Sequence, residues 1–397
     1  MAGIAGMGTT FGLPNYVGEL FHLTPEVTPL LSLIGGLTGG KKADATTFTW
    51  QTDDLRIAGQ NVALEGAAAP GAFNRVRAVV SNVCEVHQEK ASVSYTKQAA
   101  TGAINTMNTA SGIQPVQNEL DYQVAKKIKE VARDVEYSFI NGSYQSPSDN
   151  TTPRKTRGIL QAVQTNLLTV AALITSVAKS AATDTITDTS TTYVNGDKVI
   201  FSDVGASLTL TPGRTYYVVA QSTNAIKVAP VAAGTPIVIG TATVSFTKPA
   251  TATTLSPDFY NTLFQMVYDN GGLEDGDLAT IIVNSTQKRN LSKTYATAYG
   301  QFHETSRSVG GVDFTTIESD VATFNVMLDR FMPADALLVT SLDQLTPVFL
   351  EVPNKGHFFE EPLAKVGASD EVQIYGEIGL EYGKETAHGL YRGLPLL

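Results

Sequence analysis

The feature that most constrains this chain is one long amphipathic helix expected at residues 119–140. Apolar side chains recur there every three or four residues, which places them on one face of a helix. These apolar positions are Leu120, Val124, Ile128, Val131, Val135 and Phe139. At about 1.5 Å per residue the helix extends for about 33 Å, and Gly142 supplies a stop. A single helix of this length is expected to act as a strut.

The segment before this helix begins with residues that show no lasting helical or strand period. Residues 1–40 contain many glycines and only two charged side chains, Glu19 and Glu26. Such a segment has too little patterning to fold alone. We therefore expect residues 1–45 to form an arm that a neighbouring subunit holds in place.

Alternating side chains predict a projecting β-arm over residues 46–95. Phe48 and Trp50 fall on one face with polar residues between them, as a half-buried strand requires. A second alternating run covers residues 75–95. The residues between the runs, 59–72, are small and too numerous for a tight hairpin turn. The arm is therefore expected to end in a long loop.

From residue 183 to residue 250 the sequence changes to short β-branched and aromatic runs. The turn dipeptides between them are Asn195-Gly196, Pro212-Gly213 and Ala233-Gly234. Their spacing is typical of a small sandwich or barrel. A mixed pattern resumes over residues 251–335, and strands dominate residues 336–397. The fold class is therefore expected to be α+β, with a small all-β domain inserted at residues 183–250.

Composition and motif content predict no catalytic, metal or cofactor site. The 28 basic and 38 acidic residues leave a formal charge of −10, which argues against a protein that reads nucleic-acid sequence. The five histidines lack metal-ligand spacing. The single cysteine, Cys84, lies in a strand-like run that predicts a buried, inert thiol. No apolar stretch has the length of a membrane span, so no membrane partner is expected.

Six stretches of the chain carry a resemblance to a known family. They are FTWQTDDLR (48–56), NELDYQVAKKIKEVARDVEYSFING (118–142), TRGIL (156–160), IIVNSTQKRNLS (281–292), DRFMPADALLV (329–339) and EPLAKVGASDEVQIYGE (361–377). In number and order they resemble the major capsid proteins of tailed bacteriophages with the Hong Kong 97-type, or Johnson, capsid fold. The resemblance covers nearly everything outside residues 183–250.

The resemblance implies the roles of the segments. In chain order they are an N-terminal arm (1–45), an extended β-loop over a neighbouring subunit (46–95), a peripheral domain (96–182) whose spine helix is 119–140, the inserted β-rich domain (183–250), an axial domain (251–335), and C-terminal strands shared by the axial and peripheral domains (336–397). The implied function is a shell subunit rather than an enzyme.

The resemblance also implies partners and a location. The subunits would assemble as a homo-oligomer of pentamers and hexamers in an icosahedral shell around double-stranded DNA, contacted without sequence specificity. Scaffolding, portal or decoration proteins are further implied partners. No secretory signal is present, so we expect assembly in the host bacterial cytoplasm and localisation in the virion. Because Met1 directly precedes the arm, no long fused scaffolding segment is expected.

Eight side chains are expected at inter-subunit contacts, where arginine–carboxylate pairs would join neighbouring subunits. They are Trp50, Arg56, Arg75, Arg77, Arg154, Arg157, Glu360 and Glu361. Some shells of this fold also join a lysine on the extended loop to an asparagine of a neighbour. Residues 46–89 contain no lysine, and the guanidinium groups of the arginines there stay protonated. We therefore expect a shell without covalent cross-links.

Two other functions agree with parts of the pattern. An encapsulin-like compartment shell would have the same fold and enclose enzymes instead of DNA. A glycan-binding surface protein would act through the β-rich insert, with aromatic rings stacked on sugars. The aromatic residues in question are Tyr193, Phe201, Tyr216, Tyr217 and Phe246. Their strand-like surroundings favour packing in a core instead.

Overall fold

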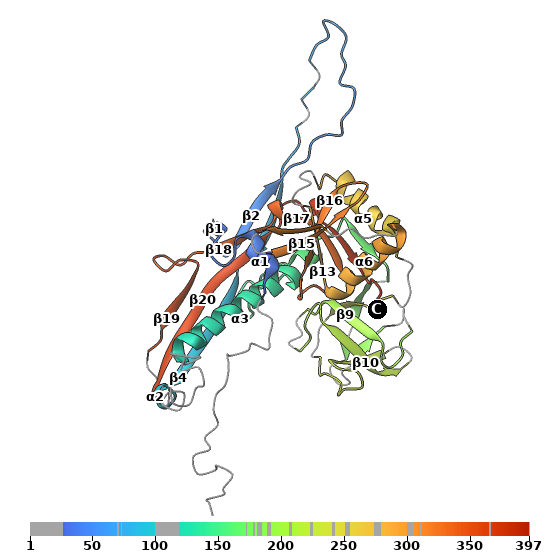
Figure 1. Cartoon of the computed structure of the whole chain (residues 1–397). Helices are drawn as coiled ribbons and strands as arrows, with labels where there is room; N and C mark the ends of the chain where they lie inside the picture. Colours follow the sequence, from blue (N-terminus) through green and yellow to red (C-terminus); the bar gives the residue numbers. More distant parts are fainter. Residues whose placement is uncertain are drawn as a thin grey trace, which may run out of the picture.

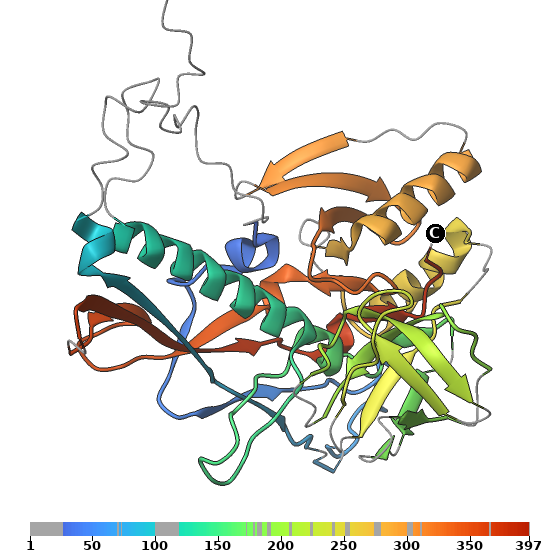
Figure 2. The same cartoon turned by 90° about the horizontal axis from the view of Figure 1, so that it is seen from below.

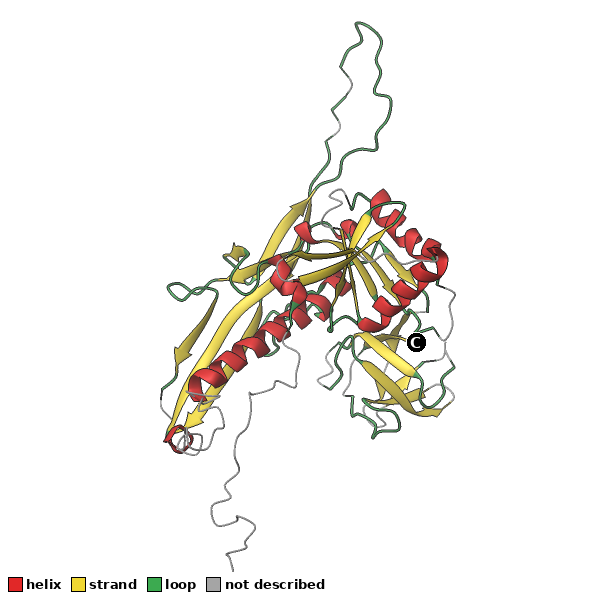
Figure 3. Ribbon diagram, viewed as in Figure 1, coloured by secondary structure: helices red, strands yellow, loops and turns green. Residues whose placement is uncertain are grey.

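A computed structural model gives the fold of most of the chain. The residues that it describes are 27–69, 71–72, 74–99, 119–171, 173–177, 179–180, 185–188, 192–205, 209–222, 225–239, 243–250, 255–273, 279–299, 305–309, 312–364 and 367–396. Residues 1–26 of the expected arm lie outside them. Figure 1 shows an elongated unit, a compact unit beside it, a third unit below the compact one, and a long projecting loop. In Figure 3 the third unit consists of strands and loops.

The elongated unit is a sheet with one long helix across it. The helix is α3 (Glu119–Asn141), and the strands are β1 (Lys41–Ala43), β4 (Glu85–Ser94), β18 (Thr346–Leu350), β19 (Phe358–Pro362) and β20 (Ser369–Glu381). The long strand β20 pairs with β4 on one edge and with β18 and β19 on the other. In Figure 2, α3 lies across these strands, and Val124 packs with Ala91 and Ile374. The predicted helix is therefore present and ends one residue later than expected.

The apolar face of α3 changes along its length. Val131, Val135 and Phe139 are buried in the largest core, but Ile128 is 42% exposed. The difference arises because the second half of α3 also contacts the short helices α1 (Pro29–Ile34) and α4 (Ile159–Ala162), whereas no other described helix covers Ile128 in this way. Ile128 therefore shares the apolar face of α3 but is not buried by the described part of the chain.

The compact unit contains a mixed sheet with two helices. Its strand order is β14 (Thr305–Val309), β15 (Val312–Glu318), β16 (Thr323–Leu328), β13 (Ala279–Val283), β17 (Leu337–Ser341), β21 (Gly389–Arg392) and β5 (Leu167–Thr169). The helices are α5 (Pro257–Asp269) and α6 (Ser285–Tyr299). Ser256 caps α5 by accepting a hydrogen bond from the Phe259 amide, and Pro257 follows at the first helical position. Apolar side chains of both helices and the central strands form the core of this unit.

The third unit is a separate sheet with its own core. Its strand order is β6 (Leu173–Val177), β12 (Val244–Thr247), β9 (Lys198–Asp203), β10 (Thr215–Ser222), β11 (Ala225–Ala229), β8 (Thr185–Thr187) and β7 (Lys179–Ser180). The sheet begins at Leu173, ahead of the expected boundary at residue 183. The segment LITSV (173–177), which that boundary leaves outside the insert, pairs with β12 at the edge of the sheet. Within this strand Ile174 is buried in the core of the third unit.

The region expected as a β-arm divides into three strands and a loop. β2 (Thr47–Thr52) and β3 (Ala78–Val83) form a two-stranded antiparallel ribbon. β4 belongs to the elongated sheet instead, so the run expected as one strand over residues 75–95 is interrupted at Cys84. The described residues between 53 and 77 contain no strand, and Figure 1 shows this part as the projecting loop.

Candidate assembly surfaces

The projecting loop between β2 and β3 exposes apolar side chains that nothing in the described part of the chain covers. Five of them are at least 82% exposed: Leu55, Ile57, Val62, Leu64 and Val76. Isolated apolar residues are common on protein surfaces, but a loop that carries several marks an interaction site. Burying each aliphatic side chain would contribute about 1.5–3 kcal/mol. The loop is therefore the first candidate contact surface.

Trp50 fixes the base of this loop to the body of the chain. Its indole Nε1 donates a 2.8 Å hydrogen bond to the Gly383 carbonyl. Its ring meets Tyr382 edge to face, with centroids 4.9 Å apart. Arg157 donates from Nη1 to the Tyr382 hydroxyl at 3.1 Å. Trp50 and Arg157 are thus brought together by Tyr382 and form contacts within the chain.

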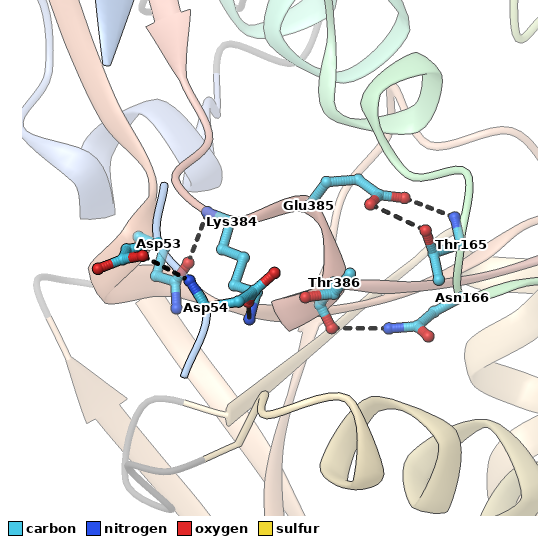
Figure 4. Close-up of polar contacts among 8 residues, drawn as sticks. Asp53, Asp54, Thr165, Asn166, Lys384, Glu385 and Thr386 are labelled. Carbon is cyan, nitrogen blue, oxygen red and sulfur yellow. Dashed lines mark hydrogen bonds and ion pairs between the residues drawn. The ribbon is translucent and has the colours of Figure 1, made fainter. Parts of the chain in front are cut away.

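A second set of contacts joins the loop base to the segment that leads into the compact unit. Lys384 forms a 2.7 Å ion pair with Asp54, and the ammonium group lowers the pKa of that carboxyl. The next residue, Glu385, accepts hydrogen bonds from the amide groups of Gln164 and Thr165. Figure 4 shows Lys384 beside Asp54 and Glu385 beside Thr165, at the short helix η3 (Glu385–Ala387). One turn therefore holds the loop and the segment at residues 164–166 together.

The other arginines of the loop lie where a neighbour could reach them. Arg56 is exposed, and among the described residues its Nη1 donates only to the Ile57 carbonyl, at 3.3 Å. Arg75 is also exposed and helps to lower the pKa of Asp54. Arg77 donates to the Gln51 side chain at 3.0 Å across the β2–β3 ribbon. Arg56 and Arg75 thus keep most of their donors available.

The remaining expected contact residues divide between internal and external positions. Arg154 forms a 3.0 Å ion pair with Glu377 of β20 and so contributes within the chain. Glu360 and Glu361 are exposed on β19, which pairs only with β20 among the described strands. Glu361 forms an ion pair with Lys355. The two carboxylates therefore mark an acidic strand edge.

Sequence reasoning missed the residues that anchor the loop. Asp54, Lys384 and Glu385 were not expected at any site, because their partners come from distant parts of the sequence. The only available signal was the position of Asp54 within the resembling stretch at residues 48–56. Nothing in the local pattern connects it to Lys384.

The described residues hold no arrangement that suggests catalysis. Burial raises the pKa of the Cys84 thiol to about 12, which keeps it protonated and inert. Burial lowers the pKa of His87 to about 4. In the part of the chain that the structure describes, no three potential ligand side chains gather as a metal site would require. No described helix has the length and apolarity of a membrane span.

The aromatic residues of the third unit form its core. Phe201 and Phe246 are fully buried, and Tyr193 and Tyr216 are at most 5% exposed. Their rings contact one another, with the Phe201 and Phe246 centroids 5.3 Å apart. Tyr217 is half-buried in β10. These four buried rings cannot stack on sugars, so the glycan-binding hypothesis keeps only Tyr217 of the five residues on which it rested.

Comparison with known proteins assigns the family. A model of the SU10 major capsid protein family matches residues 3–395. The chain belongs to this family. The major capsid protein of Escherichia phage Phieco32 is 32% identical over 129 residues, an alignment that covers 32% of this chain and 32% of that protein. The chain thus matches about a third of the length of this curated relative.

A solved capsid shows the fold over nearly the whole chain. The capsid asymmetric unit of cyanophage A-1(L) is similar with a TM-score of 0.53 and 12% identity, covering 98% of each chain. The expected α+β Hong Kong 97-type capsid fold is therefore confirmed. Membership of a major capsid protein family places the chain in the phage virion as a structural protein.

Proposed function

We propose that this capsid protein assembles into pentamers and hexamers of an icosahedral head that encloses double-stranded DNA. The observation that carries the proposal is the loop at residues 53–77, whose exposed apolar side chains require a partner. A second copy of the chain is the natural partner, because a family of shell proteins contacts mainly itself. The loop would lie over the neighbouring subunit, as the extended loop of this fold is expected to do.

The division into segments follows from the same proposal. Residues 1–45 would be the arm, 46–95 the extended loop and 96–182 the peripheral domain. Residues 251–335 would form the axial domain. The C-terminal residues 336–397 would be shared, which is supported by β17 and β21 in the compact sheet and β18 to β20 in the elongated one.

The third unit would be a small all-β domain inserted between the peripheral and axial domains. Its separate core supports this assignment. The strand order suggests that the inserted domain includes β6 and so begins at Leu173 rather than at residue 183. Its neighbours in the particle, together with scaffolding, portal and decoration proteins, would be further partners.

Inter-subunit roles are proposed for the exposed members of the expected set. Arg56 and Arg75 on the loop would meet carboxylates of a neighbour, and Glu360 and Glu361 offer such carboxylates. Trp50, Arg154 and Arg157 act within the chain and would position the loop and the elongated sheet. DNA would be contacted loosely, since the chain carries a formal charge of −10.

The proposal is tested by replacing Leu55 and Ile57 with serine together. Both side chains project from the loop at 91% and 90% exposure, so the subunit itself should keep its fold and its far-ultraviolet circular dichroism. Light scattering and negative-stain microscopy should show closed shells for the natural chain and mainly free subunits for the variant. The matched control is Val231→Ser together with Val238→Ser, two exposed positions of the third unit, which should leave assembly intact. A well-folded natural chain that stays monomeric at high concentration would refute the proposal.

A further inference from the structure

Glu136 is a charged residue that the apolar packing of α3 buries completely. Its two carboxylate oxygens accept hydrogen bonds from the amide groups of Leu30 and Leu31, at 2.9 and 2.6 Å. These amides lie in the first turn of α1, where no intrahelical acceptor exists. The residue before α1, Thr28, makes no side-chain cap. A side chain of α3 therefore replaces the local cap of α1 and fastens the two helices together.

A second buried carboxyl group, Asp329, contacts the first. Asp329 follows β16 and is 2% exposed. Its Oδ1 accepts a 2.7 Å hydrogen bond from the Phe331 amide, whereas the buried Oδ2 has no donor from any other described group. The two carboxyl groups lie within hydrogen-bonding range of each other. Two adjacent buried carboxylates cannot both be ionised at moderate cost, so the pair holds one proton.

Burial and mutual repulsion both act to keep that proton. Burial is the main cause that raises the pKa of Glu136, to about 9, and the charge of Asp329 adds to it. Burial also raises the pKa of Asp329. The shared proton lets Asp329 or Glu136 donate to the other, which supplies the missing partner of Oδ2.

The elements around the pair bring few other charges. α1, with the sequence PLLSLI, has no ionisable side chain. α3 carries Arg133, which lies over the Phe331 ring, and Tyr137, which donates to the Pro212 carbonyl. Exposed Arg330 follows Asp329, and the start of α6 brings Asn284 and Ser285, with Lys288 one turn further. The short helix η2 (Leu342–Gln344), which packs against α1, carries Asp343.

We propose that Glu136 and Asp329 form a proton-dependent latch that fastens α1 to α3 and to the end of β16. With one proton the pair is compact and caps α1. Without it, two negative charges face each other in a buried site, and the contact opens. A cavity of about 390 Å³, lined by Val27, Pro29, Asp329 and Arg330 among others, reaches the Asp329 side of the pair and gives water a route to that residue.

The sign of the pH dependence follows from linkage. In the latched state the raised pKa of the pair keeps its proton well above the ordinary carboxyl range, whereas an opened, hydrated carboxyl group loses it near its ordinary pKa of about 4. Opening therefore releases a proton between these limits. The latch is favoured at low pH and weakens as pH rises, with the opening equilibrium increasing by about tenfold per pH unit.

Hydrogen exchange of the full-length chain tests the latch, because the Leu30 and Leu31 amides are themselves the capped groups. Exchange of a peptide covering residues 27–40 would be followed by mass spectrometry from about pH 6 to about pH 9, corrected for the base-catalysed intrinsic rate. Protection should fall by roughly a hundredfold or more in the natural chain. In Asp329→Asn the amide NH₂ donates to Glu136 without a proton, so protection should change by no more than about twofold.

Two further variants keep the test decisive. Glu136→Gln offers one acceptor oxygen to two amide donors, so the peptide should lose protection at every pH. Asp343→Asn removes a carboxylate beside α1 that lies outside the pair, and it should keep the natural pH dependence. The proposal is overturned if natural protection does not vary with pH, or if Asp329→Asn retains the slope. Light scattering of the same samples reports assembly separately, so failure of the latch is distinct from failure of the shell proposal.

Discussion

Substitution of Tyr382 tests whether the base of the projecting loop is fixed by the contacts described above. Tyr382 is 2% exposed, and its ring meets Trp50 edge to face. Tyr382→Ala removes a large buried ring, which costs about 3–5 kcal/mol of unfolding free energy. About 0.5–1.5 kcal/mol of this belongs to the aromatic contact itself. The loop base should then lose its packing although the bond from Trp50 to Gly383 remains available.

The assay uses the fact that Trp50 is the only tryptophan of the chain. Its emission should shift to the red in Tyr382→Ala, because water reaches the indole ring. Tyr382→Phe keeps the ring and loses only the hydroxyl that accepts from Arg157, which costs about 1 kcal/mol of unfolding free energy. The Trp50 emission of this variant should therefore match that of the natural chain. Urea unfolding followed by circular dichroism gives the two free energies. Natural emission in Tyr382→Ala, or equal damage from both variants, would refute the assigned role of the ring.

Two further predictions concern the assembled particle. Mature particles boiled in SDS with reductant should run as one band near the 42.2 kDa chain mass, because residues 46–89 offer no lysine for a cross-link; a ladder of multimers would show otherwise. Replacement of residues 173–247 by a short Gly/Ser linker should leave shells visible by negative stain, since the third unit has its own core. The deletion breaks the hydrogen bond from Thr247 to buried Asp335, so Thr247→Val serves as the control for that loss alone.

The long elements could be predicted because their side-chain periods are local. The helix at 119–140 and the strand character of the third unit are both visible in sequence, and each depends on residues close together. The break at Cys84 was not visible, since both sides of it alternate as one strand would. The two strands differ only in their pairing partners: β3 pairs with β2, whereas β4 pairs with β20.

The contact residues were harder to predict because tertiary structure decides their role. In the sequence, Trp50 and Arg157 have the pattern of exposed surface residues. In the structure, the Trp50 ring contacts the Tyr382 ring, and Arg157 donates a hydrogen bond to the Tyr382 hydroxyl. Glu136 lies among charged residues of α3 and has the pattern of a solvent-facing position. It is buried because α1 and Asp329 pack against it from distant parts of the chain. No local signal reports such a partner.

The pairing of β20 has a mechanical consequence. β20 is bonded along one edge to β4 over ten positions and along the other to β18 and β19. Hydrogen bonds between antiparallel strands run perpendicular to the strand direction. Tension along the strands of the elongated unit therefore acts on these hydrogen bonds in shear, and it acts on all of them at the same time. Peeling would break them one at a time, but stretching requires that many fail at once. A subunit pulled along its long axis therefore resists extension far more strongly than the same strands would resist being unzipped.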